Sequence, residues 1–308
     1  MIVQVLLKEN NMLDFKMNLK EYQNLINNEL DRYVRRDDSY ETRLNGSVEY
    51  SLLAGGKRLR PILVLDTYKL FKDDYEKCIP YAVSLEMIHN FSLIHDDLPE
   101  IDNDDFRHGI LTNHKKFDHA TALLAGDMLF NQGYITISED LKNENDLEEL
   151  KNKIRVFNEF SKAVDRMIAG EYLDTELENK KIEKELLKYI HENKTGALLK
   201  LSVRMGAILA GADEEKIEKL SSFADKIGLA FQIKDDILSE IGDEKVMGKP
   251  VGNDKALNKC TYVSFYGLDG AQEELNKTID DALEILEEFG EKAEFLKGLT
   301  VYIRDREK

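Results

Sequence analysis

The stretch from 87 to 102 reads MIHNFSLIHDDLPEID and joins an apolar, helix-like run to a cluster of carboxylates. The apolar first half favours a buried helix. Pro99 disfavours helical geometry at the residue before it, so we expect the helix to end at Asp96 and Asp97. The helix dipole disfavours negative charge at that end. Because Asp102 can return from the following loop to the same point, the cluster predicts a compensating cation.

A second carboxylate pair, Asp235 and Asp236, follows another apolar run at residues 227–233. Gln232 lies three and four residues before the pair and therefore shares its helix face. Carboxylate pairs at the mouth of an apolar wall are unfavourable unless a cation neutralises them. Hard oxygen ligands in an open arrangement suit Mg²⁺, which prefers a few carboxylates plus substrate phosphates. Taken alone, each cluster could also be a solvated acidic turn.

The composition limits the classes of partner. The 308 residues are 42% hydrophobic, which is ample for a core, and the formal net charge of −17 argues against nucleic acid. The two cysteines, Cys78 and Cys260, form no disulfide framework and favour a reducing, cytoplasmic compartment. The sequence has no apolar run of about 18 residues that would predict a membrane span.

Helix-period spacing of apolar residues predicts an all-α chain. The stripe is clearest at Leu275, Ile279, Leu283, Leu286 and Phe289. The sequence shows neither strand alternation with hairpin turns nor a glycine pattern typical of dinucleotide binding. Since no linker divides the chain, we expect one domain over residues 17–308. Residues 1–16 are expected to be a disordered or additional N-terminal segment.

Glycine-flanked basic segments supply candidate phosphate sites. GGKRLRP at 55–61 combines two glycines, three cations and a helix start at Pro61. Arg can bind phosphate with two parallel hydrogen bonds, whereas Lys acts as a point charge. RHG at 107–109, KTG at 194–196 and GKPVG at 248–252 are weaker candidates. Each could be a simple glycine turn, but together with the acidic clusters they favour chemistry in which a diphosphate is the leaving group.

Other metals and reaction types fit less well. The first acidic cluster lacks the glycine of an EF-hand calcium loop. The six histidines form no H-E-x-x-H motif and the two cysteines no C-x-x-C motif, so zinc is not indicated. The sequence also contains no nucleophile elbow and no P-loop.

From about Leu19 to the C-terminus, the chain resembles the trans-isoprenyl diphosphate synthases of the polyprenyl synthetase family, most closely the bacterial short-chain farnesyl and geranylgeranyl diphosphate synthases. The motifs are GGKRLRP (55–61), HNFSLIHDDLPEIDNDDFRHG (89–109), TNH (112–114), LLAGD (123–127), KTG (194–196), GLAFQIKDDIL (228–238) and GKPVGND (248–254). The resemblance implies a bundle of about ten or more helices around a deep central cavity, and a homodimer. It also implies Mg²⁺-dependent, head-to-tail condensation of isopentenyl diphosphate with an allylic diphosphate.

The same resemblance assigns roles to individual residues. The residues matched to the two aspartate-rich motifs, which hold three Mg²⁺ ions around the allylic diphosphate, are Asp96, Asp97, Asp102, Asp235 and Asp236. The residues matched to the allylic diphosphate site are Arg107, Lys194, Lys249 and Lys259. The residues matched to the isopentenyl diphosphate site are Gly56, Lys57, Arg60, His89 and His108. Thr195 and Gln232 match polar residues beside the reacting carbons, and with Asp96, Asp97, Asp102, Lys194 and Asp235 they are the expected catalytic residues.

Phe91 is the candidate determinant of product length. It precedes Asp96 by five residues, which is about 7.5 Å along a helix. In the family, a bulky residue at this place forms the floor of the pocket for the growing chain. With the DDxxxxD form of the first motif, Phe91 resembles the floor of synthases that make the C15 product. If it is only a core aromatic, a C20 product is the alternative.

Three residues depart from the family pattern. His108 stands where a second Arg is usual, Glu171 where Gln is usual, and Ser239 where Asp is usual. Asp235, Ser239 and Asp243 share the spacing of the metal-binding helix of class I terpene cyclases, although an intact isopentenyl diphosphate site argues against a cyclase. A weakly active partner subunit of a prenyl synthase is a further alternative, which the intact first motif disfavours.

Overall fold

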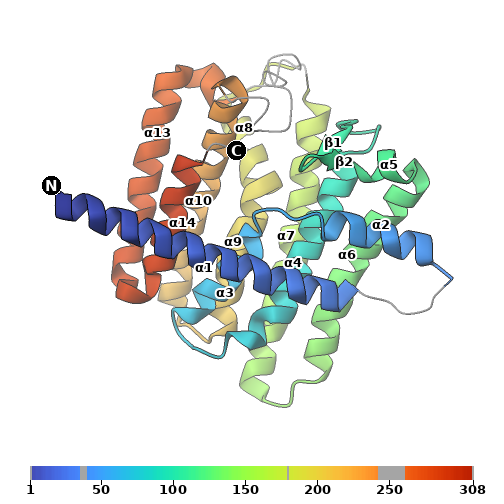
Figure 1. Ribbon diagram of the computed structural model, residues 1–308, viewed down its shortest axis with the longest axis horizontal. Coiled ribbons are helices and arrows are strands. Elements are labelled where there is room, and N and C mark those ends of the chain that lie inside the picture. The colour runs from blue at the N-terminus through green and yellow to red at the C-terminus, as the bar shows by residue number, and fades with distance from the viewer. Residues whose placement is uncertain (1, 35–39, 179, 242–260, 307–308) are drawn as a thin grey trace.

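Helices make up nearly all of the part of the chain that the structure describes (Figure 1). This computed structural model describes residues 2–34, 40–178, 180–241 and 261–306. In chain order the elements are α1 (Ile2–Val34), α2 (Thr42–Leu52), α3 (Leu59–Lys69), η1 (Tyr75–Cys78), α4 (Ile79–Asp96), β1 (Phe106–Arg107), β2 (Ile110–Leu111), α5 (Asn113–Lys116), α6 (His119–Lys142), α7 (Leu147–Glu176), α8 (Lys184–His191), η2 (Glu192–Gly196), α9 (Ala197–Leu209), α10 (Glu214–Ile241), α13 (Tyr262–Leu286), η3 (Glu287–Ala293) and α14 (Glu294–Asp305). The predicted all-α class is confirmed.

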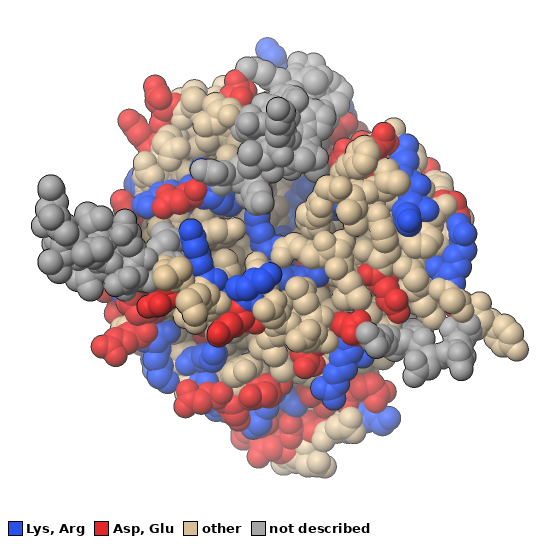
Figure 2. Space-filling model, viewed as in Figure 1, with Lys and Arg blue, Asp and Glu red and all other residues tan. Residues whose placement is uncertain are grey.

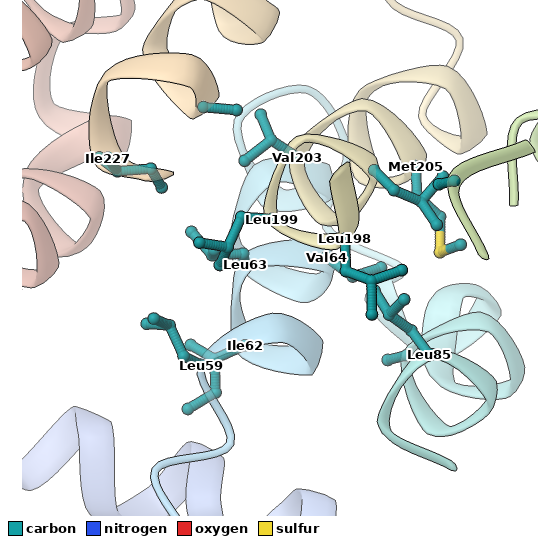
Figure 3. Close-up of a cluster of buried hydrophobic side chains, with 14 of the residues drawn as sticks. Leu59, Ile62, Leu63, Val64, Leu85, Leu198, Leu199, Val203, Met205 and Ile227 are labelled. Carbon is teal, nitrogen blue, oxygen red and sulfur yellow. The ribbon is translucent and has the colours of Figure 1, made fainter. Parts of the chain in front are cut away.

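The centre of the hydrophobic core is α3, which is buried on almost every side. It packs against α9 and α4, and α9 packs in turn against α7 and α10. In Figure 3, Leu63 and Val64 of α3 meet Leu198 and Leu199 of α9, and Leu85 of α4 lies beside them. All five side chains are buried. Burying one leucine side chain stabilises a fold by about 1.5–3 kcal/mol, so this contact holds the frame of the bundle together.

Gly206 allows α9 to approach α3 closely. A Cβ atom at this position would lie 2.3 Å from the carbonyl oxygen of Val64 and 2.9 Å from Cβ of Thr67. Both distances are shorter than a non-bonded contact allows, so even Gly206→Ala would push the two helices apart.

The way in which α4 ends places the first acidic pair. The helix has Pro80 in its first turn, ends at Asp96 as the sequence predicts, and has Asp97 as its C-cap. Pro99 lies in the loop that follows. That loop folds back, and the backbone N–H of Asp102 donates to the carbonyl oxygen of Asp96 at 2.9 Å. The expected return of the loop toward the end of the helix is therefore seen.

The N-terminal helix α1 crosses the front of the bundle in Figure 1. Within it, the ring of Phe15 lies 5.2 Å from that of Phe295 and 6.0 Å from that of Tyr302, both on α14. Gly298 makes room for this ring, since a Cβ there would lie 2.6 Å from Phe15 Cδ2. The segment 1–16 thus has a packed residue near its end, while the division of the chain at residue 17 stays a prediction.

The structure bears on the predicted absence of a membrane span and on the cysteines. Among the described helices, none is both long enough and apolar enough to span a membrane. Cys78 is buried, and burial raises the pKa of its thiol, which makes it a poor nucleophile. Cys260 lies outside the described residues.

Candidate active site

A cavity of about 1180 Å³ is lined by residues of α3, α4, α7, η2, α9 and α10, as the expected central cavity requires. The predicted site residues that line it are Gly56, Lys57, Arg60, His89, Phe91, Asp96, Arg107, His108, Lys194, Thr195, Gln232 and Asp235. Figure 2 shows a hollow at the centre of one face, with Lys and Arg side chains gathered around it. Asp97, Asp102 and Asp236 do not line the cavity. Lys249 and Lys259 lie outside the described residues.

The two aspartates of the first pair point to different surroundings. Asp96 lines the cavity, whereas the side chain of Asp97 is 4% exposed and lies in the wall. Arg107 Nε donates to both carboxylate oxygens of Asp97, at 2.8 and 2.9 Å, and Arg107 Nη2 lies 2.6 Å from Oδ1. Arg107 comes from the β1–β2 hairpin, so Asp97 fixes this hairpin to the end of α4. Asp97 thereby positions a cation beside the cavity.

The second pair divides in the same way. Asp235 lines the cavity, whereas Asp236 is buried. Asp236 Oδ2 accepts a hydrogen bond of 2.6 Å from the backbone N–H of Tyr262, the first residue of α13. A carboxylate that accepts from a free N–H at a helix start stabilises that start. Asp236 therefore ties α13 to α10.

Burial raises the pKa of Asp96, and the nearby Glu171 raises it further, while Lys194 and Arg107 oppose the shift. The net direction is upward because a partly desolvated carboxylate stands close to a second one. The pKa of Glu171 is also raised, again mainly by burial. A further cation that binds near Asp96 and Glu171 would therefore stabilise their ionised forms.

Lys194 is the cation already present there. Its Nζ lies 2.9 Å from Glu171 Oε2 and 2.6 Å from Asp174 Oδ2. Burial lowers the pKa of Lys194, but the neighbouring Asp174, Glu171 and Asp96 outweigh burial and raise it. Lys194 sits in the π-helical turn η2, a type of turn that is common at functional sites. Gly170 of α7 admits the turn, because a Cβ there would lie 2.3 Å from the backbone nitrogen of Lys194.

Asp174 was not among the residues expected from the sequence. Its signal is the spacing in GEYLD at 170–174, which places Glu171 and Asp174 three residues apart on one helix face, directly after a glycine. The π-helical turn has no comparable signal, since it depends on the close approach of α7.

The basic end of the cavity is built on a backbone with positive φ. Gly55 and Gly56 have φ of 98° and 120°, and Arg58 adopts 52°. Arg58 is buried, and its Nη1 lies 2.7 Å from Glu86 Oε1. Its Nε donates to Asn27 Oδ1 at 2.9 Å and its Nη2 to a backbone carbonyl of α2. Of the three cations in GGKRLRP, Arg58 is thus bound to other groups of the protein. This corrects the expectation that all three cations bind a phosphate.

The other two cations of this segment are better placed for an anion. Lys57 and Arg60 line the cavity, as Arg58 does, but Arg58 donates from its Nε, Nη1 and Nη2 to groups of the protein. Arg60 is half-buried, and its buried Nε has no hydrogen-bond partner in the part of the chain that the structure describes. The helix α3 begins at Leu59 rather than at Pro61, which lies within the first turn, where a missing N–H costs no helical bond.

Both predicted histidines favour the neutral form. Burial lowers the pKa of His89 well below its ordinary value, and Arg60 and Arg107 lower it further. Burial and the nearby Arg107 and Arg58 also lower the pKa of His108. At neutral pH these residues can therefore donate a hydrogen bond to a diphosphate but add no full charge.

Phe91 lies where the chain-length prediction places it, in the cavity wall. Its ring is edge-on to that of Phe130, with centroids 5.1 Å apart, and to that of His95 at 5.3 Å. Phe130 in turn contacts the ring of Tyr134 at 5.2 Å. Phe91 thus separates the cavity from a column of aromatic rings between α4, α6 and α7. This geometry fits a floor, and it also fits a core aromatic.

The donor atoms of the cavity-facing aspartates fit Mg²⁺. Asp96 and Asp235 offer hard carboxylate oxygens toward one cavity. Within the described ranges, no three side chains of Asp, Glu, His or Cys stand close enough together to hold a metal by themselves. Mg²⁺ bound by few carboxylates takes its remaining ligands from water and substrate phosphates. A metal held by Asp96 and Asp235 would leave ligand positions for water and for substrate phosphates.

Comparison with known proteins decides the family. The family model described as Polyprenyl synthetase matches residues 41–299. The chain belongs to the polyprenyl synthetase family. A farnesyl diphosphate synthase of Geobacillus stearothermophilus is 43% identical over 86% of this chain and 88% of its own length. A geranylgeranyl diphosphate synthase of Cyanophora paradoxa is 38% identical over 94% of this chain and 95% of its own length.

A solved crystal structure has the same fold. The crystal structure of an FPP/GFPP synthase from Zymomonas mobilis superposes with a TM-score of 0.83 at 31% identity. The match covers 95% of this chain and 99% of that one. The expected isoprenoid-synthase type of bundle is therefore confirmed.

Proposed function

We propose that this protein is a Mg²⁺-dependent trans-prenyltransferase that condenses isopentenyl diphosphate with dimethylallyl or geranyl diphosphate and makes farnesyl diphosphate (C15). The observation that carries the proposal is one cavity lined by both carboxylates and cations. Asp96 faces it near Lys194 and Arg107, and Asp235 faces it near Arg60. Lys57 lines the same cavity. One cavity can therefore hold a metal-bound diphosphate on its carboxylates and a second diphosphate on Lys57 and Arg60.

The cavity-facing carboxylates of Asp96 and Asp235 are assigned to the allylic diphosphate. Asp96 and Asp235 would hold Mg²⁺, with Asp102 reaching the same place from the loop after α4. Bound Mg²⁺ would neutralise the diphosphate and stabilise its charge as a leaving group. Three ions, and direct ligation by Asp97 and Asp236, stay predictions. The contacts of the last two residues with Arg107 and the Tyr262 amide support positioning roles for them.

The reaction starts with breakage of the allylic C–O bond, whose electron pair leaves with the diphosphate. Lys194 and Arg107 stabilise the negative charge that develops on the leaving group. The alkene of isopentenyl diphosphate, held by Lys57 and Arg60, then attacks the allylic carbocation and forms the new C–C bond. Loss of a proton to the departing diphosphate restores a double bond. The apolar part of the wall, which includes Phe91, excludes water from the cation.

Chain length follows from the floor of the cavity. A C15 product requires that Phe91 stop the growing chain, and its packing against Phe130 supports such a stop. Phe91→Ala should therefore shift products to C20 or longer, measured by mass spectrometry. Phe71→Ala, in a phenylalanine that does not line the cavity, is the control and should leave the products unchanged. An unchanged distribution for Phe91→Ala would remove this residue as the floor.

A homodimer is the proposed assembly. On α6, Leu124 and Ile135 are exposed by 53% and 41% and share one face of the helix, while Leu123, exposed by 43%, points about 100° away from Leu124. Exposed apolar stripes of this kind mark protein interfaces. Leu124→Glu should produce monomers in analytical ultracentrifugation, whereas Ile154→Glu on α7, equally exposed at 53%, should not. A cytoplasmic location and the absence of a nucleic-acid partner likewise stay predictions.

A product assay tests the function itself. The purified protein is incubated with Mg²⁺, isopentenyl diphosphate and either allylic primer, and the products are identified by mass spectrometry. A Mg²⁺-dependent C15 product supports the proposal. A C20 product supports the prenyltransferase activity but contradicts the role of Phe91 as the floor of the cavity. No condensation contradicts the proposal and favours a partner subunit, or a cyclase if an allylic diphosphate is consumed alone.

A further inference from the structure

The end of the chain reaches the second acidic pair. Arg306 follows α14 in an extended conformation, and its side chain is only 3% exposed. Its Nη2 donates to Asp235 Oδ1 at 2.5 Å and to the carbonyl oxygen of Phe231 at 3.0 Å. Its guanidinium carbon lies 4.1 Å from the centroid of the Phe231 ring. Three separate contacts thus hold Arg306 against α10, next to which α14 lies (Figure 1).

This contact sets the charge balance of a cavity-lining carboxylate. Asp235 lines the cavity and is 44% exposed on the side chain, so it is open to solvent on one side and paired with Arg306 on the other. A guanidinium and a divalent cation on the same carboxylate repel each other, and each weakens the binding of the other. The protein therefore supplies Asp235 with a positive charge of its own.

The cations near Asp96 are anchored differently. Arg107 is bound to Asp97, and Lys194 is bound to Glu171 and Asp174. Neither Arg107 nor Lys194 makes these ion pairs with the Asp96 carboxylate, so a cation can approach Asp96 without breaking them. At Asp235, by contrast, the ion pair is made by the cavity-facing carboxylate itself.

We propose that Arg306 is an internal counter-ion that competes with the divalent cation for Asp235, so that binding at the second acidic pair releases the end of the chain. This inference rests on the proposed function, because it takes Asp235 as a ligand of the metal–diphosphate complex. Arg306 is then a positioning residue, which holds Asp235 and the Phe231 ring in place until the cation arrives. The sign of its effect on metal affinity is opposite to that of a residue that merely supports the site.

The test measures metal binding without turnover. Mn²⁺ is titrated into the full-length protein in the presence of inorganic pyrophosphate, and free Mn²⁺ is followed by electron paramagnetic resonance. Arg306→Gln should bind Mn²⁺ about two- to fivefold more tightly, a modest effect because Asp235 is partly exposed. Arg306→Lys, which keeps the charge, should stay close to the parent. Unchanged or weaker binding by Arg306→Gln would overturn the proposal.

A matched control lies two residues earlier. Arg304 has the same charge at the same helix end but pairs with Asp305, 2.7 Å from its Nε. Arg304→Gln should leave Mn²⁺ affinity unchanged. Equal tightening by both variants would contradict the proposal, because it would show a general effect of net charge rather than competition at Asp235.

Amide hydrogen exchange gives a second readout of the released chain end. The backbone N–H of Arg306 donates to the carbonyl oxygen of Tyr302 at 3.0 Å. Mn²⁺ with pyrophosphate should accelerate exchange in the C-terminal peptide, and Asp235→Asn should do so without metal. No acceleration in either case contradicts the inference.

Asp235→Asn also separates this inference from the proposed function. If it leaves Mn²⁺ affinity unchanged, Asp235 is not a metal ligand and both proposals fail at this residue. If it weakens Mn²⁺ binding while Arg306→Gln has no effect, the metal site stands and only the competition is excluded.

Discussion

At the end of α4, Asp96 faces the cavity while Asp97 holds Arg107, and on α10, Asp235 faces the cavity while Asp236 accepts the N–H of Tyr262. In both acidic pairs, the first aspartate lines the cavity and the second makes a contact that stabilises the fold. They differ in the origin of the neutralising charge. The first pair lies beside cations from the β1–β2 hairpin and η2, whereas Asp235 of the second pair is bound by Arg306, which follows α14. The two acidic pairs thus obtain nearby positive charge from different parts of the fold.

The largest effect should come from the cavity-facing aspartates. Asp96→Asn should lower Mg²⁺-dependent turnover by about 10²–10³-fold, because it removes charge that holds the cation at the leaving group. Steady-state kinetics with geranyl diphosphate measures this loss. Asp105→Asn, which removes an exposed carboxylate paired with Lys115, is the control and should keep full activity. Full activity of Asp96→Asn would break the assignment of the first aspartate to the cavity.

The inner aspartates should show their effect in stability. Asp97→Ala leaves Arg107, 20% exposed on its side chain, without its carboxylate and should lower the free energy of unfolding by about 3 kcal/mol. Asp236→Ala removes one hydrogen bond to a backbone amide and should lower it by about 1–2 kcal/mol. Urea denaturation measures both. Equal losses would show that the two pairs are anchored with equal strength and would contradict this expectation.

Asp66 is a buried carboxylate outside the cavity, so a substitution there tests the effect of a buried charge on stability without changing the site. Asp66 accepts a hydrogen bond of 2.6 Å from the Tyr22 hydroxyl, and burial raises the pKa of Asp66 to about 6. Since the folded-state pKa lies above the ordinary value of 3.8, ionisation destabilises the fold as the pH rises through this range. Asp66→Asn should raise the free energy of unfolding by about 1–2 kcal/mol at pH 7.5 and by less below pH 4.

Thermal denaturation at both pH values checks this dependence on Asp66. Turnover should be unchanged, because the residue does not line the cavity. A gain that does not vary with pH would show that the ionised carboxylate is not the cause.

The smallest effect concerns Glu171, which lies near the first pair only. Glu171→Gln removes one of the two carboxylates bound to Lys194 and leaves Asp174 in place. Lys194 should then be more available to the allylic diphosphate, and the KM for that substrate should fall about two- to fivefold. The KM for isopentenyl diphosphate is the internal control and should not change. A higher allylic KM would show that Glu171 helps to bind the cation rather than competing for Lys194.

Much of the site was predictable from sequence because its signals are local. Pro99 marks the end of α4, the glycines at 55 and 56 allow the positive φ of the loop before α3, and apolar spacing predicts the helices. Twelve of the residues expected to bind substrate, metal or the growing chain line one cavity. The direction in which Arg58 points was not predictable, because it depends on Glu86 of α4 and Asn27 of α1. Asp174 and the π-helical turn depend in the same way on contact between α7 and η2.

By itself, the sequence determined the all-α class, the family and the composition of the two acidic pairs, because helix period, proline and glycine act over a few residues. Only the tertiary structure decided which aspartate of each pair faces the cavity, since neighbouring helical residues point about 100° apart and the packed partners select between them. It also brought Arg306 to Asp235 across 71 residues. No local pattern encodes such a contact, because it forms only when α14 packs on α10.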